Sequence, residues 1–429
     1  MGEASGSAFV LRACIFLLLL IVSLVQLAFF TLLPDVSIHA EWCNATLAAR
    51  SPAGRAPTSP ELAPPLRLLY QSLYLSPREI ARREKEAERL EAARKLDLEL
   101  YLGALPSARP VVIGPGPTEP VELPTSVINI FLQRHPSNTQ YFGSALKHQP
   151  AEKAVWMLQN AELFDRHELS SPPVGVVMVK NRVALQKVLE YRHRHQLSYS
   201  ALYTKHTGHD VFQPSMQRDW TSFLHVPGAS PAKTTKVIVQ AWAAHPEWPK
   251  LVLRVAQPEL CHWISRHFGS ATSWRLANVD FQCGRLAEAD KAALQNQIGL
   301  HVCPSEGEAF SHVLNEARSA GALILTTDVA PMNELVDRES GVLVGQPTTW
   351  WWQTKGDLFM PLGRVDMAAI EQGVEQILLL PVEERRRMGR RARAHYLEDR
   401  AFFLNAMAAL EQAICQDEIR IDKLQPYLY

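Results

Sequence analysis

Short apolar runs alternate with helix-like segments over most of the chain. Four such runs come first, at residues 126–132, 154–158, 174–179 and 199–203. After a break near residue 219, the pattern resumes with four more, at 222–226, 250–255, 299–303 and 322–326. Continuous apolar runs of about five residues that alternate with helices are typical of parallel strands buried on both faces. The pattern therefore predicts an α/β protein with two doubly wound domains and a cleft between them.

An uncharged stretch at residues 13–33 stands apart from this pattern. A helix that spans a bilayer takes about 20 apolar residues, whereas the core of a signal peptide has about 7–15. Arg12 precedes the stretch and Asp35 follows it, which favours a cytosolic N-terminus. We therefore expect a cytosolic tail at residues 1–12 and a transmembrane signal anchor at 13–33. The alternative is a cleaved signal peptide.

Residues 34–125 are rich in proline, alanine and arginine, and they include a charged run typical of a solvated helix. This composition predicts a stem and linker. Asn44 begins the only glycosylation sequon of the chain, just beyond the expected anchor, a position that agrees with a lumenal stem. The two α/β domains are then expected at 126–218 and 219–404, followed by a C-terminal helix and tail at 405–429.

The chain as a whole is electrically neutral, with 44 Lys and Arg against 44 Asp and Glu. No overall basic field is present to hold nucleic acid, so we predict no nucleic-acid partner. Six cysteines are too few for a disulfide scaffold, and a Cys261–Cys283 bridge and free buried thiols both remain open. The run 385–393 has six arginines. It either contacts an anionic lipid or phosphate or, as we favour, forms a solvated helical face.

Histidines close together in the sequence raise the question of a metal site. The four positions are His193, His195, His206 and His209. Zinc or copper would require their nitrogens to converge, but most of these side chains have polar or charged neighbours, with no cysteine or carboxylate cluster nearby. We therefore predict solvated histidines and no bound metal.

The most chemically suggestive residues follow the apolar run 299–303. Glu308 lies in a loop, and Glu316 lies about a turn and a half inside the helix that comes next. The start of this helix, around Phe310, Ser311 and His312, presents free N–H groups and the positive end of the helix dipole, which suits a phosphate. The carboxylate of Glu316 suits hydrogen bonds from two vicinal hydroxyls, such as those of a ribose.

Seven residues separate Glu308 from Glu316. With its strand–loop–helix–strand context, the segment resembles the Glu-x7-Glu signature of retaining, nucleotide-sugar-dependent glycosyltransferases of the GT-B fold, in family 4 or group 1. The resemblance covers roughly residues 126–404 and is strongest over roughly 300–337. It implies a GT-B-like fold of two Rossmann-like domains, with the acceptor-side domain at 126–218 and the nucleotide-sugar-binding domain at 219–404. The resemblance also implies that the last helix crosses back to the first domain.

The resemblance implies roles for particular residues. Glu308 is expected near the donor sugar, Glu316 on the donor ribose, and the amides around residues 310–312 on the diphosphate. The next loop brings Asn333 and Glu334 near the donor. Members of the family usually have the sequence Glu-Gly-Phe-Gly where this chain has Glu308-Ala309-Phe310-Ser311. Two small side chains therefore replace two glycines in the expected phosphate pocket.

A second loop, after the run 222–226, resembles the family's Gly-Arg-x4-Lys-Gly loop, whose Arg and Lys bind the donor diphosphate. Gly228 and Lys233 are present, with one residue fewer between them, but Ala229 stands in the place of the Arg. Lys233 is therefore expected to bind the donor and assist catalysis as a point charge on the phosphates. Either Lys236 compensates for the missing Arg or the donor site differs from that of the family.

Two pairs of residues in the first domain are expected to face the cleft. Lys180 and Asn181 directly follow an apolar run, so they lie at the carboxyl end of a strand. His209 and Asp210 lie near the end of the same domain. Each pair is positioned to contact the acceptor or the donor sugar, although a surface role is equally consistent with the sequence.

Together these features predict a retaining glycosyltransferase, of the hexosyl or pentosyl class, anchored as a type II membrane protein of the Golgi or ER with a lumenal catalytic domain. It would move a sugar from a nucleotide-sugar donor to a hydroxyl of a glycan, glycoprotein or glycolipid, with no cofactor and no obligatory metal. One alternative is a catalytically inactive GT-B-like membrane-anchored binding or scaffold protein, which Ala229 and the two replaced glycines favour. A nucleotide-sugar epimerase or phosphorylase of the same fold is a second alternative.

Overall fold

A computed structural model describes residues 35–39, 104, 109–113, 129–132, 154–158, 175–228, 232–269, 273–348, 361–415, 424 and 426–429. The expected anchor at 13–33, the sequon at Asn44 and most of the expected stem lie outside the described residues. Among the helices that are described, none combines the length and the apolar character needed to cross a membrane.

The first sheet has six strands in the order β2-β1-β3-β4-β5-β6. In chain order they are β1 (Asp35–His39), β2 (Arg109–Ile113), β3 (Asn129–Leu132), β4 (Ala154–Leu158), β5 (Val176–Val179) and β6 (Ser200–Tyr203). Strands β3 to β6 are parallel, and β1 pairs antiparallel with both β2 and β3. Because β1 and β2 come from residues 34–125, part of the range expected as stem and linker belongs to this sheet.

Helix α5 (Arg182–His195) connects β5 to β6 in the first domain. Its buried side chains lie at helical spacing and form one face: Ala184, Leu185, Val188 and Tyr191. The helix begins at Asn181, whose side chain accepts a hydrogen bond from the Ala184 N–H, and this cap fixes the chain direction directly after β5.

The second sheet is parallel throughout, in the order β12-β11-β10-β7-β8-β9. Its strands are β7 (Asp219–His225), β8 (Leu251–Val255), β9 (Val279–Cys283), β10 (Ile298–Val302), β11 (Leu323–Thr327) and β12 (Gly341–Val344). This is the strand order of a doubly wound fold. The chain adds β8 and β9 on one side of β7, and then returns to add β10, β11 and β12 on the other side. Ligands of such sheets bind beyond the carboxyl ends of the strands at this switch point, here between β7 and β10.

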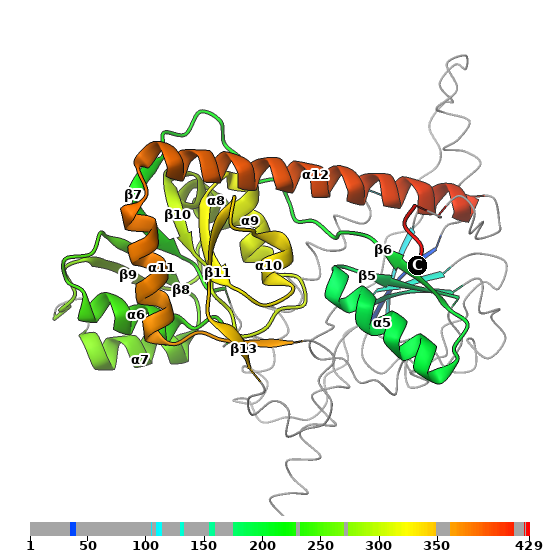
Figure 1. Cartoon of the computed structure of the whole chain (residues 1–429), viewed down its shortest axis with the longest axis horizontal. Helices are drawn as coiled ribbons and strands as arrows, with labels where there is room; N and C mark the ends of the chain where they lie inside the picture. Colours follow the sequence, from blue (N-terminus) through cyan, green and yellow to red (C-terminus); the bar gives the residue numbers. More distant parts are fainter. Residues whose placement is uncertain are drawn as a thin grey trace, which may run out of the picture.

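Helices cover both faces of the second sheet (Figure 1). One core cluster packs α6 (Thr235–Ala244), α7 (Pro258–Phe268) and α11 (Met367–Leu379) on one face. The other face carries α8 (Glu288–Gln297), α9 (His312–Ala320) and α10 (Met332–Leu335). Along β11, Leu323 and Leu325 face the first group while Ile324 faces the second. Burial on both faces is therefore the reason that these strands appear as continuous apolar runs.

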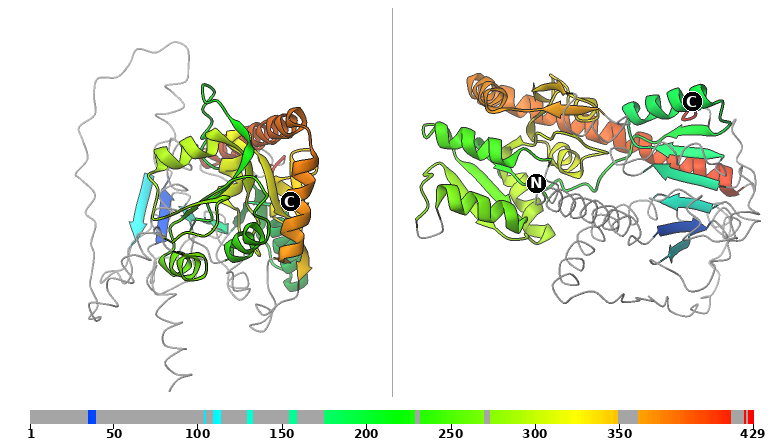
Figure 2. Two further views of the ribbon diagram at one scale, coloured as in Figure 1. Left: turned by 90° about the vertical axis from the view of Figure 1, so that its left-hand side faces the viewer. Right: turned by 90° about the horizontal axis from the view of Figure 1, so that it is seen from below.

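Helix α12 (Val382–Cys415) extends from the second domain to the first (Figures 1 and 2). Near its start, Met388 joins the core of the second domain, and further along Phe402 lies 5.7 Å from Tyr203 of β6, between ring centroids. The return of the last helix to the first domain, expected from the family resemblance, is thus present. Residue 404, where we expected the second domain to end, lies inside α12. Beyond it, Leu428 forms a β-bridge with Leu202.

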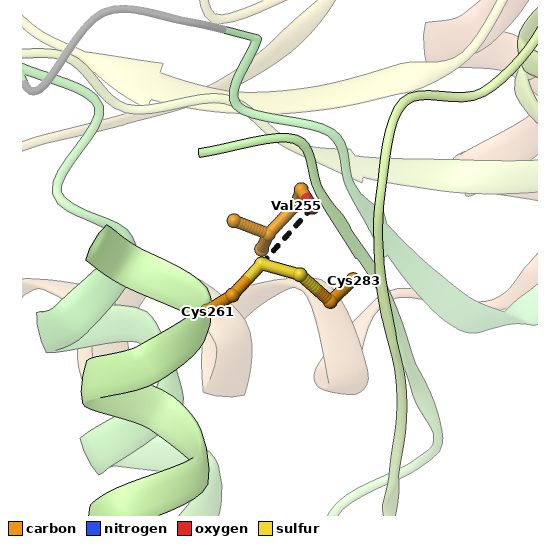
Figure 3. The surroundings of a disulfide bond; sticks show 3 residues. All are labelled: Val255, Cys261 and Cys283. Atoms are coloured by element: carbon orange, nitrogen blue, oxygen red, sulfur yellow. Dashed lines mark hydrogen bonds between the residues drawn. A yellow bond between two sulfur atoms is a disulfide. The ribbon is translucent and has the colours of Figure 1, made fainter. Parts of the chain in front are cut away.

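Two smaller features complete the second domain. A short antiparallel pair, β13 (Gln346–Thr348) and β14 (Leu362–Arg364), lies beside the switch point. Cys261 of α7 and Cys283 at the end of β9 form a disulfide, with their Cα atoms 5.8 Å apart. In Figure 3 the Cys261 sulfur also lies near the Val255 carbonyl oxygen, at 3.3 Å. Of the two states left open by the sequence, the bridge is the one present.

Candidate functional site

Two loops meet at the switch point of the second sheet. The first follows β7 and contains Gly228, whose φ of 67° lies in the left-handed region that favours glycine. The second follows β10. Its Glu306 N–H donates to the Ala232 carbonyl oxygen at 2.8 Å, and the Ser305 hydroxyl lies 3.2 Å from the same oxygen. These hydrogen bonds tie together two segments that are far apart in the sequence.

Lys233 and Glu308 form an ion pair across this junction. The Lys233 Nζ donates to Oε1 of Glu308, and the two side chains are 11% and 12% exposed. Among the residues predicted for the donor site, these two contact each other directly. A largely buried pair of this kind holds both groups in place, because removing one partner leaves an uncompensated charge.

The start of helix α9 lies three residues beyond Glu308 in the same loop. Ser311 caps the helix by accepting a hydrogen bond from the Leu314 N–H at 3.4 Å, and its φ is 67°. The backbone at this position is therefore left-handed although the residue is not glycine. Phe310 is buried, and its ring lies 5.1 Å from that of His312. The first N–H groups of α9 and the positive end of its dipole thus lie close to Glu308, at the end of the loop that follows β10.

Glu316 lies further along α9 and faces α8. Its carboxylate accepts hydrogen bonds from Lys291 at 3.0 Å and from Gln295 at 2.7 Å. Burial raises the pKa of the nearby Cys303 thiol to about 12, and the charges of Lys233, Glu316 and Glu308 all act on this thiol. Both glutamates of the predicted motif are therefore close to the same buried residue, although no contact joins them to each other among the described residues.

The first domain contacts this loop through the carboxyl end of β5. The Asn181 amide donates to the Ala309 carbonyl oxygen at 2.6 Å, and the Lys180 Nζ lies 5.4 Å from the centroid of the Phe310 ring. His206 packs edge-on against the same ring, with centroids 4.4 Å apart. Lys180 and Asn181 therefore lie beside the residues predicted to bind the donor, as their position after a strand indicated.

Glu334 joins the two domains. Its carboxylate accepts hydrogen bonds from the backbone N–H groups of Arg182 at 2.7 Å and Val183 at 2.8 Å, at the start of α5. Burial raises the pKa of Glu334, although these hydrogen bonds oppose the shift. The neighbouring Asn333 amide donates to Asp328 at 3.1 Å. Both residues predicted near the donor thus have protein partners, and Glu334 acts as an additional cap of α5.

Asp210 pairs with helix α12. Asp210 accepts two hydrogen bonds from Arg393 of α12, at 2.6 and 2.8 Å. Burial alone would raise the pKa of Asp210, but the hydrogen bonds from Arg393 and the Phe212 N–H lower it. His209 is exposed. The expected position of His209 and Asp210 in a cleft stays a prediction.

Two further sequence expectations concern positive charge and metal. Lys236, the expected substitute for the missing Arg, lies with its Nζ 5.3 Å from the centroid of the Trp263 ring of α7, and Ala229 lies outside the described residues. Within the described part of the chain, no three His, Cys, Asp or Glu residues are grouped closely enough to hold a metal ion.

Three residues beside the site carried no signal in the sequence for this position. Lys291 and Gln295 hold the Glu316 carboxylate, yet they lie in α8, which has an ordinary mixture of charged and apolar residues. His206 was predicted to be a solvated histidine rather than a metal ligand; this was wrong, because His206 is buried and packs against Phe310. An expectation that α8 and α9 pack side by side would have been needed to find the first two.

Comparisons with known proteins gave matches among solved structures alone. No protein-family model matches the sequence, and no curated protein matches it. HepE of Anabaena, solved with UDP-glucose, is 16% identical over 64% of this chain and 73% of its own, with a TM-score of 0.45. Sucrose-phosphate synthase of Thermosynechococcus elongatus is 17% identical over 64% of this chain and 71% of its own, with a TM-score of 0.47. WaaG, a glycosyltransferase involved in lipopolysaccharide biosynthesis, is 15% identical over 66% of this chain and 85% of its own, with a TM-score of 0.43. These are remote resemblances, and the α/β architecture rests on the strand order described above.

Proposed function

We propose that the protein is a GT-B-type glycosyltransferase that moves a sugar from a nucleotide-sugar donor to an acceptor hydroxyl with retention of configuration. The observation that carries this proposal is the Lys233–Glu308 pair at the switch point, beside the start of α9. A cation, a helix N-terminus and a carboxylate at one crevice suit a ligand that combines a diphosphate with a sugar.

The diphosphate would bind to Lys233 and to the first N–H groups of α9. Both offer positive charge where the leaving group becomes more negative as the glycosidic bond breaks, so both stabilise the transition state. The acceptor hydroxyl attacks on the face from which the diphosphate leaves, through an oxocarbenium-like state, and its proton passes to the departing diphosphate. In this proposal the Glu308 carboxylate faces the donor sugar and stabilises the positive charge that develops on it.

Glu316 is proposed to bind the donor ribose. A carboxylate has about four lone-pair sites for hydrogen bonds, and Lys291 and Gln295 use two of them. The remaining sites suit the two ribose hydroxyls. Positive charge from Lys233 and α9 would serve at the diphosphate, so we expect no cofactor and no obligatory metal ion. The acceptor is proposed to be a glycan, protein or lipid that enters from the side of Lys180 and Asn181.

We further propose a type II membrane protein with its catalytic domain in the ER or Golgi lumen. The disulfide between Cys261 and Cys283 supports this location, because disulfides persist in oxidising compartments and are rare in the cytosol. The location would be tested by expressing the full chain and its Asn44→Gln variant. A mobility shift on glycosidase treatment in the first and not in the second is expected, and a chain without glycan would argue against lumenal exposure of Asn44.

The activity is tested by screening nucleotide sugars against the full chain and measuring release of nucleoside diphosphate. Lys233→Ala is expected to lower the rate at least about 100-fold, the effect typical of losing one group that stabilises a transition state. Glu316→Ala is expected to slow release at limiting donor by raising the donor KM, because it removes a ribose contact. Lys187→Ala and Glu375→Ala are matched controls, because Lys187 is partly exposed, Glu375 is exposed, and both lie outside the site. If both site variants release diphosphate as fast as these controls, the proposed site is wrong.

A second candidate is a binding or scaffold protein without transferase activity. One observation favours it: Lys233, Glu308, Glu316 and Glu334 all have protein partners in the structure. Lys233 and Glu308 in particular would have to exchange their mutual contact for a ligand contact. Stabilisation by a nucleoside diphosphate in a thermal-shift assay, without release from any donor, would support this candidate over the transferase.

A further inference from the structure

A hollow of about 280 Å³ lies beneath the first half of α12, away from the candidate donor site. Four arginines line it: Arg218 precedes β7, and Arg386, Arg390 and Arg393 come from α12. Figure 1 shows α12 passing along the second domain beside β7. The aromatic side chains Phe212 and Trp220 form the apolar part of the lining. A hollow of this size suits a small ligand rather than a protein segment.

The hollow and the candidate donor site lie at opposite ends of the same elements. Trp220 stands at the start of β7, and Gly321 of the lining is the C-cap of α9. The donor site uses the loop after β7 and the start of α9. Helix α9 has nine residues and is therefore roughly 13 Å long, which separates the two locations. A ligand in the hollow is thus distinct from the proposed donor.

The charges of the lining are only partly balanced. Arg393 pairs with Asp210, and Arg386 pairs with Glu383 at 2.7 Å. The Arg218 guanidinium donates to the carbonyl oxygens of Asn296, Ala320 and Gly321 and to the Asn296 amide oxygen. Among the described residues it has no carboxylate partner, and Arg390 has no partner of either kind. Two of the four guanidinium groups therefore lack a neighbouring negative charge.

Buried Arg385 adds to this excess beside the hollow. It donates to the carbonyl oxygens of Leu380, Trp220 and Leu378. Within the described structure it too lacks a carboxylate partner. Burial lowers the pKa values of both Arg218 and Arg385, as expected where a positive charge is removed from water without an anion. The exposed Arg386–Glu383 pair contributes little by itself, so Arg386 can exchange Glu383 for a ligand at small cost.

The charge and the geometry together specify the ligand chemistry. Guanidinium groups bind phosphate oxygens through paired N–H groups. Arg386 and Arg390 can offer such pairs, whereas Arg218, whose N–H groups already donate to protein oxygens, contributes its charge. A phosphate monoester carries about −1.5 to −2 charges at neutral pH, which matches the two unbalanced arginines of the lining. Trp220 is buried, and its ring lies 5.7 Å from the Arg218 guanidinium. The exposed Phe212 ring, with Arg393 4.6 Å from its centroid, offers apolar surface to the group that the phosphate is attached to. We propose that this arginine hollow binds a phosphate monoester, free or as part of a lipid headgroup, separately from the donor site.

The first experiment is titration of the full chain, in detergent micelles and at low ionic strength, with inorganic phosphate. The test variant is Arg386→Gln with Arg390→Gln, which removes two exposed lining charges. The matched control is Arg387→Gln with Arg391→Gln, on the same helix and with the same loss of charge, because these arginines pair with Glu384 and Glu339 and do not line the hollow. Thermal unfolding of both variants verifies that they fold.

The expected result is at least a tenfold loss of phosphate affinity in the test variant and less than a twofold change in the control. Lys233→Ala separates this site from the donor site and is expected to retain the binding. Equal losses in the test and control variants would show only a diffuse charge effect and would overturn the proposal. Binding that is lost in Lys233→Ala and kept in the test variant would also overturn the proposal. So would a complete absence of binding to the unaltered chain, with inorganic phosphate and with both phosphate esters described next.

Two further ligands identify the source of the phosphate. A soluble sugar monophosphate represents the free form, and a short-chain phosphatidic acid represents the lipid headgroup. Tighter binding of the sugar phosphate, sensitive to the test variant, would support a soluble ligand. Binding of the phosphatidic acid alone, with the same sensitivity, would support a headgroup. Either result supports the proposed chemistry, and insensitivity of both ligands to the test variant contradicts it.

Discussion

Lys233 and Glu308 are 75 positions apart in the chain, yet they share a hydrogen bond across the switch point of the second sheet. The pair keeps the Lys233 ammonium engaged with a carboxylate at the place where a diphosphate would bind. In the proposed function, the donor diphosphate would therefore compete with Glu308 for this cation.

The Glu308→Gln variant tests this competition. Removing the negative charge frees Lys233 for the phosphates, so we expect nucleoside diphosphate to bind about three to ten times more tightly. Transfer should nevertheless fall at least about 100-fold, because the carboxylate that faces the developing positive charge is lost. Calorimetry measures the first effect and diphosphate release the second. Glu306→Gln, in the same loop, is the control, and equal affinities in all three proteins would contradict the competition.

Ser311 is expected to respond in opposite directions to two small substitutions. Ser311→Gly removes the left-handed strain of about 1 kcal/mol and loses only a few tenths from the cap, so the free energy of unfolding should rise by about 0.5 kcal/mol. Ser311→Ala keeps the strain and loses the cap, so it should fall by about 1 kcal/mol. Chemical denaturation of both variants measures these changes. A stabilised alanine variant would show that the cap contributes nothing.

Glu334 is expected to hold the start of α5 in place. Glu334→Ala leaves the N–H groups of Arg182 and Val183 without their acceptor, and we expect a loss of about 1–2 kcal/mol in the free energy of unfolding. Hydrogen exchange at these two amides should become faster. The control is Glu339→Ala, whose partner Arg391 is exposed, so its effect should stay within about 0.5 kcal/mol. Unchanged exchange at α5 would exclude the capping role.

The Cys261–Cys283 bridge encloses a loop of 22 residues. A loop of this length predicts about 3 kcal/mol of stabilisation through the entropy of the unfolded chain. The double variant Cys261→Ser with Cys283→Ser should be less stable by that amount, and reductant should destabilise the unaltered protein but leave the variant unchanged. Mass spectrometry of a non-reduced digest detects the linked peptides. Free thiols at both positions in protein from the secretory pathway would contradict the bridge.

Two buried histidines predict a specific dependence of stability on pH. Burial lowers the pKa values of His225 and His301 to about 4, against an ordinary value of about 6.5. Between these values the unfolded chain binds protons that the folded protein does not. Stability should therefore fall as the pH decreases from about 6.5 to about 4, by up to about 1.4 kcal/mol per pH unit for each histidine.

The His225→Gln variant isolates one of these protons. Its unfolding free energy should depend less steeply on pH within the same window, by about one proton, whatever its absolute stability. Thr235→Val is the control, because it removes the hydroxyl 2.9 Å from Nε2 of His225 but retains the imidazole. Its slope should therefore match that of the unaltered protein. If His225→Gln also retains the full slope, His225 is not the titrating group.

The strand pattern was predictable because both faces of the second sheet are buried. Strands β10 and β11 begin and end within one residue of the apolar runs predicted at 299–303 and 322–326. All of their residues are buried, so a polar side chain in these strands needs a hydrogen-bond partner and most positions are apolar. The meeting of Lys233 and Glu308 could also be expected, because both follow strands whose carboxyl ends share one edge. The strands needed only local patterns and a general rule about parallel sheets, whereas Lys233 and the role of Glu308 were singled out by the family resemblance.

Contacts that depend on the placement of whole elements could not be predicted in this way. The hydrogen bonds of Glu334 with α5 require the relative position of two domains, and those of Glu316 require the packing of α8 against α9. Strand β2 was also missed. Its short run Arg109–Ile113 contains a proline and was assigned to a linker, although proline is tolerated in an edge strand such as this one.

The bridge between Leu202 and Leu428 has a consequence for the order of events during protein synthesis. Tyr429 also hydrogen-bonds Arg192, which lies 237 positions earlier in the chain. At about 5–20 residues per second, the ribosome needs roughly ten to fifty seconds to make the intervening chain. During that interval the β6 edge of the first sheet lacks this partner, whereas the described strands of the second sheet are all synthesised by residue 344, well before the interval ends. The domain that begins first in the chain is therefore the one completed last, and β6 is exposed to chaperones and to other nascent chains until then.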